Sequence, residues 1–198
     1  MAYFCQFIGT ERDQDVSQAC LQALCYMSAS ILPGGAIQPL LDMVKRIAMS
    51  ESYKTKMSML EFLQVAVFTN FPSIVCNPVY KNQVTRLVTN LLSDPHITVR
   101  QKAAKILGGL LHSGFLSGSS LTELLGDLRG RVRTKMTRQG KRFRKEEAEA
   151  GSQDKLNYHS GILGLCAFVE AFPYDVPEFV PPILMELSTH LNDPQVCL

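Results

Sequence analysis

The chain has 198 residues, of which 46% are hydrophobic and 19% are charged, and its formal net charge at pH 7 is +2. This composition is too apolar for a wholly disordered chain, and the length suits one domain with a substantial core. No apolar run approaches the ~20 residues that span a bilayer, and residues 1–15 do not have the pattern of a signal peptide. We therefore expect a folded protein that has no membrane partner.

Cysteine and histidine patterns exclude several kinds of site. The six cysteines form no CxxC pair and no dense framework, which favours reduced thiols in the cytosol or nucleus. The four histidines are isolated and show no metal-ligand spacing. The chain also lacks a Gly-x-Ser-x-Gly nucleophile motif and a phosphate-binding glycine loop. These patterns predict a protein that has no metal, no cofactor and no enzymatic activity.

Apolar side chains recur at helical spacing along most of the chain. A helix over 36–49 requires Pro39 to lie in its first turn, because proline disrupts a helix interior. Residues 70–80 contain two prolines and are predicted to form a loop. The remaining predicted helices cover residues 15–32, 52–69, 84–91, 97–112, 121–128, 158–172 and 176–191. Strand signals are weak, so the fold class is all-α, and the repeated helix pairs indicate a HEAT/armadillo-like α-solenoid.

Residues 91–111, LLSDPHITVRQKAAKILGGLL, carry the pattern of a HEAT repeat. Asp94 is suited to cap the following helix, and Pro95 breaks the preceding one. Arg100 is predicted to reach an acidic capping residue in an adjacent repeat. A second Asp-Pro turn occurs at residues 193–194 and predicts that a further helix follows.

These patterns divide the chain into four segments. Residues 1–14 form an N-terminal segment that is poorly defined by sequence, and residues 15–128 form HEAT-like repeats. Residues 129–156 form a linker that is first basic and then acidic. Residues 157–198 form a further HEAT-like helix pair, which we expect to be truncated at the next repeat.

The charge is distributed unevenly. Residues 129–145 contain nine of the 20 lysines and arginines and no acid. This basic strip is either a solvated loop between repeats, or a nuclear-import signal or electrostatic contact. Only one aromatic residue interrupts it, which argues against direct nucleic-acid binding through base stacking. The residues that would carry the import or contact role are Lys141, Arg142, Arg144 and Lys145.

Two short motifs allow both a structural and a functional interpretation. Asn77-Pro78-Val79-Tyr80 spells the NPxY pattern that phosphotyrosine-binding domains recognise, but it lies between two apolar helices. We interpret it as a turn that connects helices. Asn70 and Phe71 follow a predicted helix, where Asn70 suits a C-terminal cap and Phe71 a core aromatic.

Several stretches resemble a known family. These include YKTKMSMLEFLQVAVFTNF at 53–71, the segment 87–116, and SGILGLCAFVEAFPYDVP at 160–177, which is followed by LSTHLNDPQ at 187–195. They are similar to the C-terminal region of the large HEAT-repeat proteasome activators, the proteasome activator complex subunit 4 family. The resemblance covers nearly the whole chain from about residue 15.

The resemblance implies a non-enzymatic scaffold. Members of the family dock on the 20S proteasome core particle and favour entry of peptides or unfolded proteins without ATP or ubiquitin. The family is associated with the nucleus and cytoplasm, with DNA repair, and with degradation of acetylated histones in male germ cells. It is credited with reading acetyl-lysine through an Asn-Phe pair in a bromodomain-like stretch, and Asn70 and Phe71 match that pair. An asparagine amide donates to an acetyl carbonyl while an aromatic ring contacts its methyl group.

One departure from the family concerns the end of the chain. The family ends in a hydrophobic–Tyr–any tail that helps to open the proteasome gate, whereas residues 195–198 read QVCL. We therefore expect a fragment that lacks the gate-opening tail, and an uncovered apolar end that promotes self-association. The alternative function is a generic HEAT or armadillo adaptor that binds a partner helix or linear motif.

Overall fold

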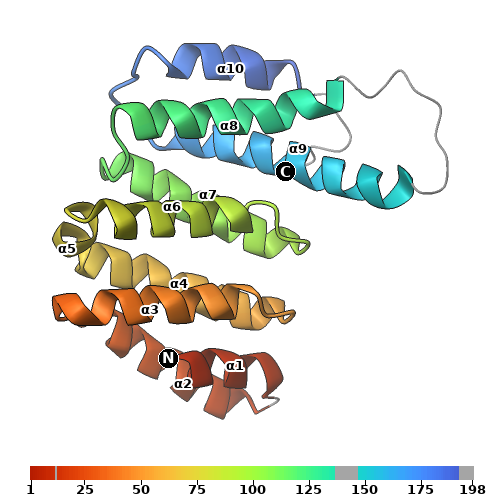
Figure 1. The fold of residues 1–198 in the computed structure, drawn as a ribbon. Helices are drawn as coiled ribbons and strands as arrows, with labels where there is room; N and C mark the ends of the chain where they lie inside the picture. The colour runs from red at the N-terminus through yellow and green to blue at the C-terminus, as the bar shows by residue number, and fades with distance from the viewer. Residues whose placement is uncertain (12, 137–146, 192–198) are drawn as a thin grey trace. The chain divides into compact units, whose positions relative to one another are not determined.

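The computed structural model describes residues 1–11, 13–136 and 147–191, and within these ranges it contains ten helices and no strand (Figure 1). The predicted all-α class and the HEAT-like pairing of helices are confirmed. None of the helices in the described ranges has the length and apolar character needed to cross a membrane. The chain forms two compact units, residues 1–91 and 92–198, which we describe separately.

The first unit is built around α4, which packs against α1, α2, α3 and α5, while α6 packs against α3 and α5. Apolar side chains that point between these helices form its core, among them Leu41, Leu60, Leu63 and Val84. The helices are α1 (Ala2–Thr10), α2 (Gln14–Ser28), α3 (Gly34–Ala48), α4 (Tyr53–Thr69), α5 (Phe71–Val75) and α6 (Pro78–Leu91).

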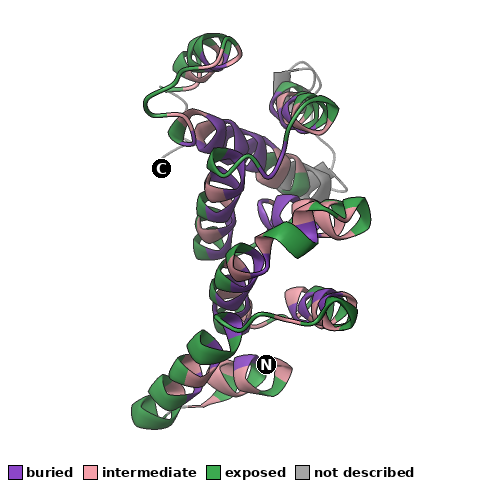
Figure 2. Cartoon of the chain, turned by 90° about the vertical axis from the view of Figure 1, so that its left-hand side faces the viewer, coloured by how far each residue is buried: buried purple, intermediate pink, exposed green. Residues whose placement is uncertain are grey.

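The second unit is built around α9, which contacts α7, α8 and α10. Its core includes Phe115, Leu128 and Phe168, all fully buried, and Figure 2 shows buried residues on the helix faces turned toward their neighbours. The helices are α7 (Ile97–His112), α8 (Ser119–Met136), α9 (Glu147–Glu170) and α10 (Val180–Ser188).

Gly114 directs the turn between α7 and α8. Its φ of 70° lies in the left-handed region, which glycine adopts without a steric penalty. The amide of Phe115 then donates to the carbonyl oxygen of Leu110 at 3.0 Å. This bond closes the end of α7 and places the Phe115 ring in the core.

Two local predictions about helices were wrong. The predicted loop 70–80 contains α5 and the start of α6, because Pro72 lies in the first turn of α5 and Pro78 is the first residue of α6. Pro39 is not in the first turn of α3 but is its sixth residue. It is tolerated because both Pro39 and Gly35, whose carbonyl would otherwise accept the missing hydrogen bond, are exposed to water.

Helices also extend beyond the predicted apolar stripes. Residues 1–14, for which the sequence predicts no element, contain α1. The helix predicted to end at residue 128 continues to Met136, and the helix predicted to begin at residue 158 begins at Glu147. About half of the residues added to α8 and α9 are Arg, Lys, Glu, Ala or Gln, which favour helix without contributing to an apolar stripe.

Candidate functional site

The Asn70 side chain lies buried at the junction of α4 and α5, with only 3% of its surface exposed. Its Oδ1 accepts from the backbone amide of Leu32 at 2.7 Å. Its Nδ2 donates to the carbonyl oxygens of Ser30 at 3.2 Å and Ala66 at 2.9 Å. Both amide hydrogens therefore have acceptors. Asn70 is the C-cap of α4, as its position after an apolar stripe predicts. Its bonds to Leu32 and Ser30 also connect the turn between α2 and α3 to the end of α4.

Phe71 follows Asn70 and is the first residue of α5. Its side chain is half-buried, and its ring lies nearly parallel to that of Phe68, with centroids 6.3 Å apart. A hollow lined by Asn70 and by apolar side chains of α3, α4 and α5 has a volume of only about 10 Å³. That volume holds about one water molecule. Acetyl-lysine binding by Asn70 and Phe71 stays a prediction, and it requires Asn70 to release its bonds and the hollow to widen.

The four residues singled out in the basic strip, Lys141, Arg142, Arg144 and Lys145, lie outside the described residues. The described beginning of the strip is helical and belongs to α8. There Arg129 donates through Nε to Glu186 of α10 at 2.8 Å, and both side chains are partly buried. This arginine therefore contributes to helix packing within the second unit.

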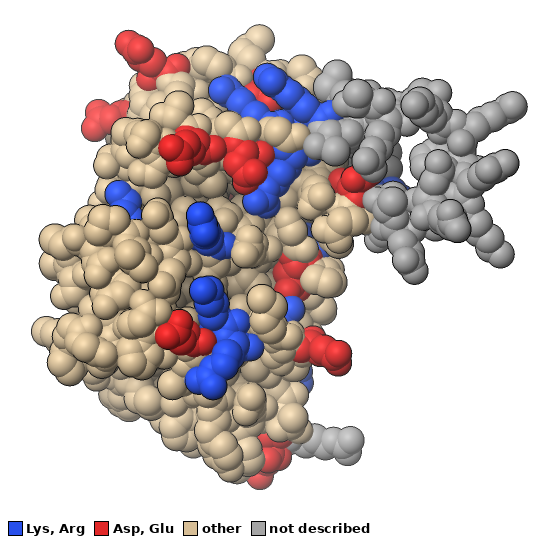
Figure 3. Space-filling model, in the orientation of Figure 1, with Lys and Arg blue, Asp and Glu red and all other residues tan. Residues whose placement is uncertain are grey.

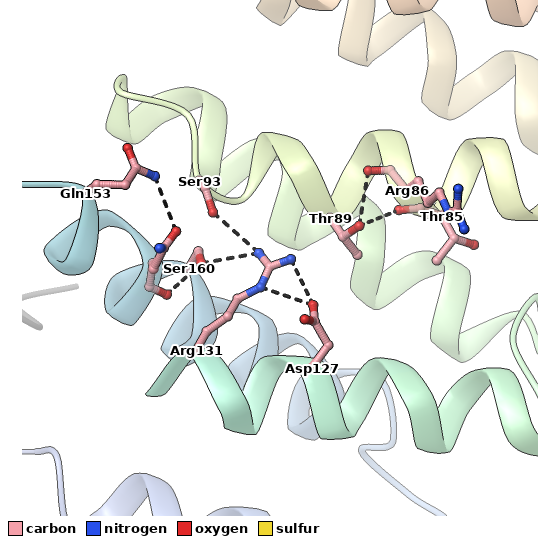
Figure 4. Close-up of polar contacts among 9 residues, drawn as sticks. Thr85, Arg86, Thr89, Ser93, Asp127, Arg131, Gln153 and Ser160 are labelled. Atoms are coloured by element: carbon pink, nitrogen blue, oxygen red, sulfur yellow. Dashed lines mark hydrogen bonds and ion pairs between the residues drawn. The ribbon is translucent and has the colours of Figure 1, made fainter. Parts of the chain in front are cut away.

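Arg131 joins three segments of the second unit (Figure 4). It forms an ion pair with Asp127 one turn earlier on α8, at 2.8 Å. Its Nη1 donates at 3.4 Å to the hydroxyls of Ser93, before α7, and Ser160, on α9. The i,i+4 spacing of Asp127 and Arg131 is visible in the sequence. The two serines were missed because nothing local marks them as neighbours of this arginine.

The Asp-Pro turn of the HEAT-like segment differs from its prediction. Asp94 is not the N-cap of α7: His96 holds that position, and Asp94 Oδ1 accepts from the His96 amide at 2.8 Å. Arg100 donates to the carbonyl oxygens of Asp94 at 2.7 Å and Pro95 at 3.0 Å. The Arg100 guanidinium therefore binds the Asp-Pro turn of its own repeat. The predicted contact with an acidic cap in an adjacent repeat was wrong, because the carbonyl groups of the nearer turn are within reach.

His159 lies in α9 close enough to Arg100 for their charges to interact. Only 8% of its surface is exposed, and its Nδ1 has no hydrogen-bond partner among the described residues. Burial lowers the pKa of His159, and the positive charge of Arg100 lowers it further. The imidazole is therefore neutral at physiological pH. The sequence did not predict this pair, because packing of α7 against α9 creates it.

The NPxY motif forms the predicted turn between helices. Asn77 Oδ1 accepts from the amides of Val79 at 3.0 Å and Tyr80 at 3.5 Å. These bonds satisfy amides in the first turn of α6. The structure therefore confirms the interpretation of this motif as a helix-connecting turn.

The helix pairs and the Asp-Pro turn define a helical-repeat protein of the HEAT type. A sequence model of the HEAT repeat matches residues 84–113. A second model, described as "Proteasome activator complex subunit 4-like, C-terminal", matches residues 155–198.

Comparison with curated proteins extends this match over most of the chain. The chain is 35% identical to proteasome activator complex subunit 4 of Homo sapiens over 87% of its length. It is 33% identical to the Xenopus laevis protein of the same name and 35% identical to subunit 4A of Danio rerio, each over 87% of its length. Over most of its length the chain is therefore similar to members of the proteasome activator complex subunit 4 family. It spans 9% of the length of these relatives.

Proposed function

We propose that this chain is a non-enzymatic module of a proteasome activator, which supplies helical-repeat surface for binding the 20S core particle. The observation that carries the proposal is the 35% identity to a human protein named as a proteasome activator subunit, over 87% of the chain. The matched part is a small share of that relative, so the proposal concerns a contribution to binding. Opening of the proteasome gate by the chain alone is not part of it.

The polar side chains of the described residues support a scaffold role. Asn70 joins a turn to a helix end, Arg100 closes the HEAT-like turn, and Arg131 joins α8 to α9. Each satisfies main-chain or hydroxyl groups that packing removes from water. Within the described ranges, no three His, Cys, Asp or Glu residues gather as a metal site would require.

Binding to the core particle tests the proposal directly. Purified 20S particles are immobilised, and the chain is titrated over them by biolayer interferometry. We expect saturable binding that a longer activator of the same family displaces. An unrelated HEAT-repeat protein of similar size is the control, because a generic adaptor has no reason to prefer the proteasome. Binding no stronger than that of the control would contradict the proposal.

Recognition of acetylated histones is the finer part of the proposal, with action in the nucleus and cytoplasm. It is supported by the resemblance of Asn70 and Phe71 to the Asn-Phe pair of the family. The test is titration of matched acetylated and unmodified histone-tail peptides into the chain and into Asn70→Ala, at a temperature where both are folded. We expect a preference for acetylated peptide that the variant loses. Equal binding of both peptides by the wild-type chain would reduce Asn70 to a structural role.

A further inference from the structure

Helix α2 presents an apolar stripe at one end of the first unit (Figure 1). One side of this helix packs against α1 and α4, and its opposite side is exposed to water. Along that side lie Val16, Ala19, Ala23, Tyr26 and Met27, which recur at three- and four-residue spacing. We call these five residues the α2 stripe. Tyr26 is 79% exposed, and Val16 and Met27 are 39% and 41% exposed, so the stripe is open to a partner.

The surface around the stripe carries no charge. Residues 16–41 contain no Asp, Glu, Lys, Arg or His. On the face drawn in Figure 3, lysine and arginine side chains gather over α3 and α6 rather than over α1 and α2. The exposed side of a helix normally carries charged residues, whereas the centre of a protein interface is depleted of charge and enriched in tyrosine and methionine. The composition of α2 is therefore that of an interface.

The order of residues in the α2 stripe suits a second copy of the same stripe. When two α2 helices pack antiparallel about a twofold axis, Val16 of each copy lies opposite Met27 of the other. Ala19 and Ala23 then meet at the centre, where their small side chains let the two helix axes approach closely. Asp15 precedes the stripe at the N-terminal end of α2. Antiparallel pairing keeps the two copies of this acid at opposite ends, whereas parallel pairing would bring like charges together.

We propose that the chain forms a twofold-symmetric dimer through the α2 stripe, in which two α2 helices pack antiparallel. The 15 residues of α2 span roughly 22 Å, and a contact of that length buries less than the ~800 Å² per partner of a standard stable interface. The dimer is therefore weak and reversible, with a dissociation constant of roughly 10–100 μM. It differs from association through the C-terminal end, which the sequence leads us to expect. It also forms without the proteasome.

The first test is sedimentation velocity of the full chain under reducing conditions, over concentrations that span the expected dissociation constant. We expect the average mass to rise from 22.0 kDa toward twice that value. Tyr26→Glu places a carboxylate in the contact of each copy and should weaken dimerisation about tenfold or more. Tyr174→Glu adds the same charge at an exposed tyrosine of the second unit and should leave dimerisation unchanged. Both tyrosines are exposed, so circular dichroism should show the wild-type fold in each variant. A wild-type chain that stays monomeric, or equal weakening by Tyr174→Glu, would refute the dimer.

The second test asks which residues face each other across the contact. Val16→Glu and Met27→Lys each introduce an unpaired charge and should weaken dimerisation about fivefold or more. The variant with both substitutions should recover most of the wild-type affinity, since the new carboxylate of each copy then faces the new ammonium group of the other. Within one chain the two positions are three helical turns apart, too far to pair with each other. No recovery would overturn the antiparallel contact. Weakening by Met185→Glu, at an exposed position on α10, would assign the association to the second unit and overturn it as well.

Discussion

The backbone of Gly161 in α9 lies directly against the backbone of Leu128 in α8. A Cβ atom built on Gly161 would be 2.9 Å from the Leu128 carbonyl oxygen and 2.7 Å from Cγ2 of Val132. Gly164, almost one turn further along α9, faces the Leu128 side chain at similarly short distances. The missing side chains of the two glycines therefore set the close approach of α8 and α9.

Replacing Gly161 by alanine should destabilise the second unit. The added methyl group meets main-chain atoms of α8, which cannot move aside without shifting the helix, and such overpacking costs about 1–3 kcal/mol. Gly126→Ala is a matched control, because a Cβ at that position of α8 meets nothing within 4 Å. Glycine is unfavourable inside a helix, so the control should gain about 0.5–1 kcal/mol. Urea denaturation of the two variants measures the difference, and equal stabilities would contradict the close contact.

Asn70→Ala should destabilise the first unit by about 1–3 kcal/mol, because it leaves the half-buried Leu32 amide without its acceptor and removes the amide group that donates two hydrogen bonds. Ser73→Ala, at an exposed position on the adjacent helix α5, should change stability by less than about 0.5 kcal/mol. Thermal and chemical unfolding of the two variants test this expectation. Similar behaviour of both would show that the Asn70 bonds add little to stability.

His159 should make the second unit less stable in mild acid. Its pKa in the folded state is lowered from the ordinary 6.5, so below that value the unfolded chain binds more protons than the folded chain. The contribution of neutral His159 to the free energy of unfolding is fully present above the pKa of the unfolded state. It falls as the pH drops toward the pKa of His159 in the folded state. His159→Gln should make the dependence shallower in urea denaturation between about pH 5 and 8. An unchanged pH dependence in the variant would assign the loss of stability to other groups.

Cys5 should resist alkylation in the folded protein, whereas Cys25 should react readily. Cys5 is fully buried, and burial raises the pKa of its thiol despite a hydrogen bond with Ser58. The reactive species is the thiolate, so burial and a raised pKa both slow the reaction. Cys25 on α2 is exposed. Iodoacetamide labelling followed by mass spectrometry should find Cys5 modified only under denaturing conditions, and early labelling would show that α1 detaches from α4.

Helix α7 shows what sequence periodicity predicts well. Its predicted span of 97–112 agrees with the structure, because a strong apolar stripe follows an Asp-Pro turn. Helix α5 shows the opposite. Its five residues are too short for a stripe, and the nearby prolines suggest a loop although they fit first helical turns.

The site contacts were harder to predict than the helices. Asn70 was correctly interpreted as a cap from its position after an apolar stripe, but its acceptors and donors include residues 38 and 40 positions earlier. Arg100 was recognised as a member of the HEAT pattern, yet its partner was assigned to the wrong place. Local sequence sets where a polar residue lies on a helix, whereas tertiary packing decides which groups it meets.

The bonds of Asn70 have a consequence for how the first unit opens. The Leu32 amide lies outside the helices, where exchange with solvent deuterium is normally fast, but its nitrogen donates a hydrogen bond to Asn70 Oδ1 at 2.7 Å. It exchanges only when the end of α4 separates from the turn after α2. Deuterium uptake at this single amide should therefore follow uptake at the C-terminal turn of α4, so that two segments distant in sequence form one cooperative unit of local unfolding.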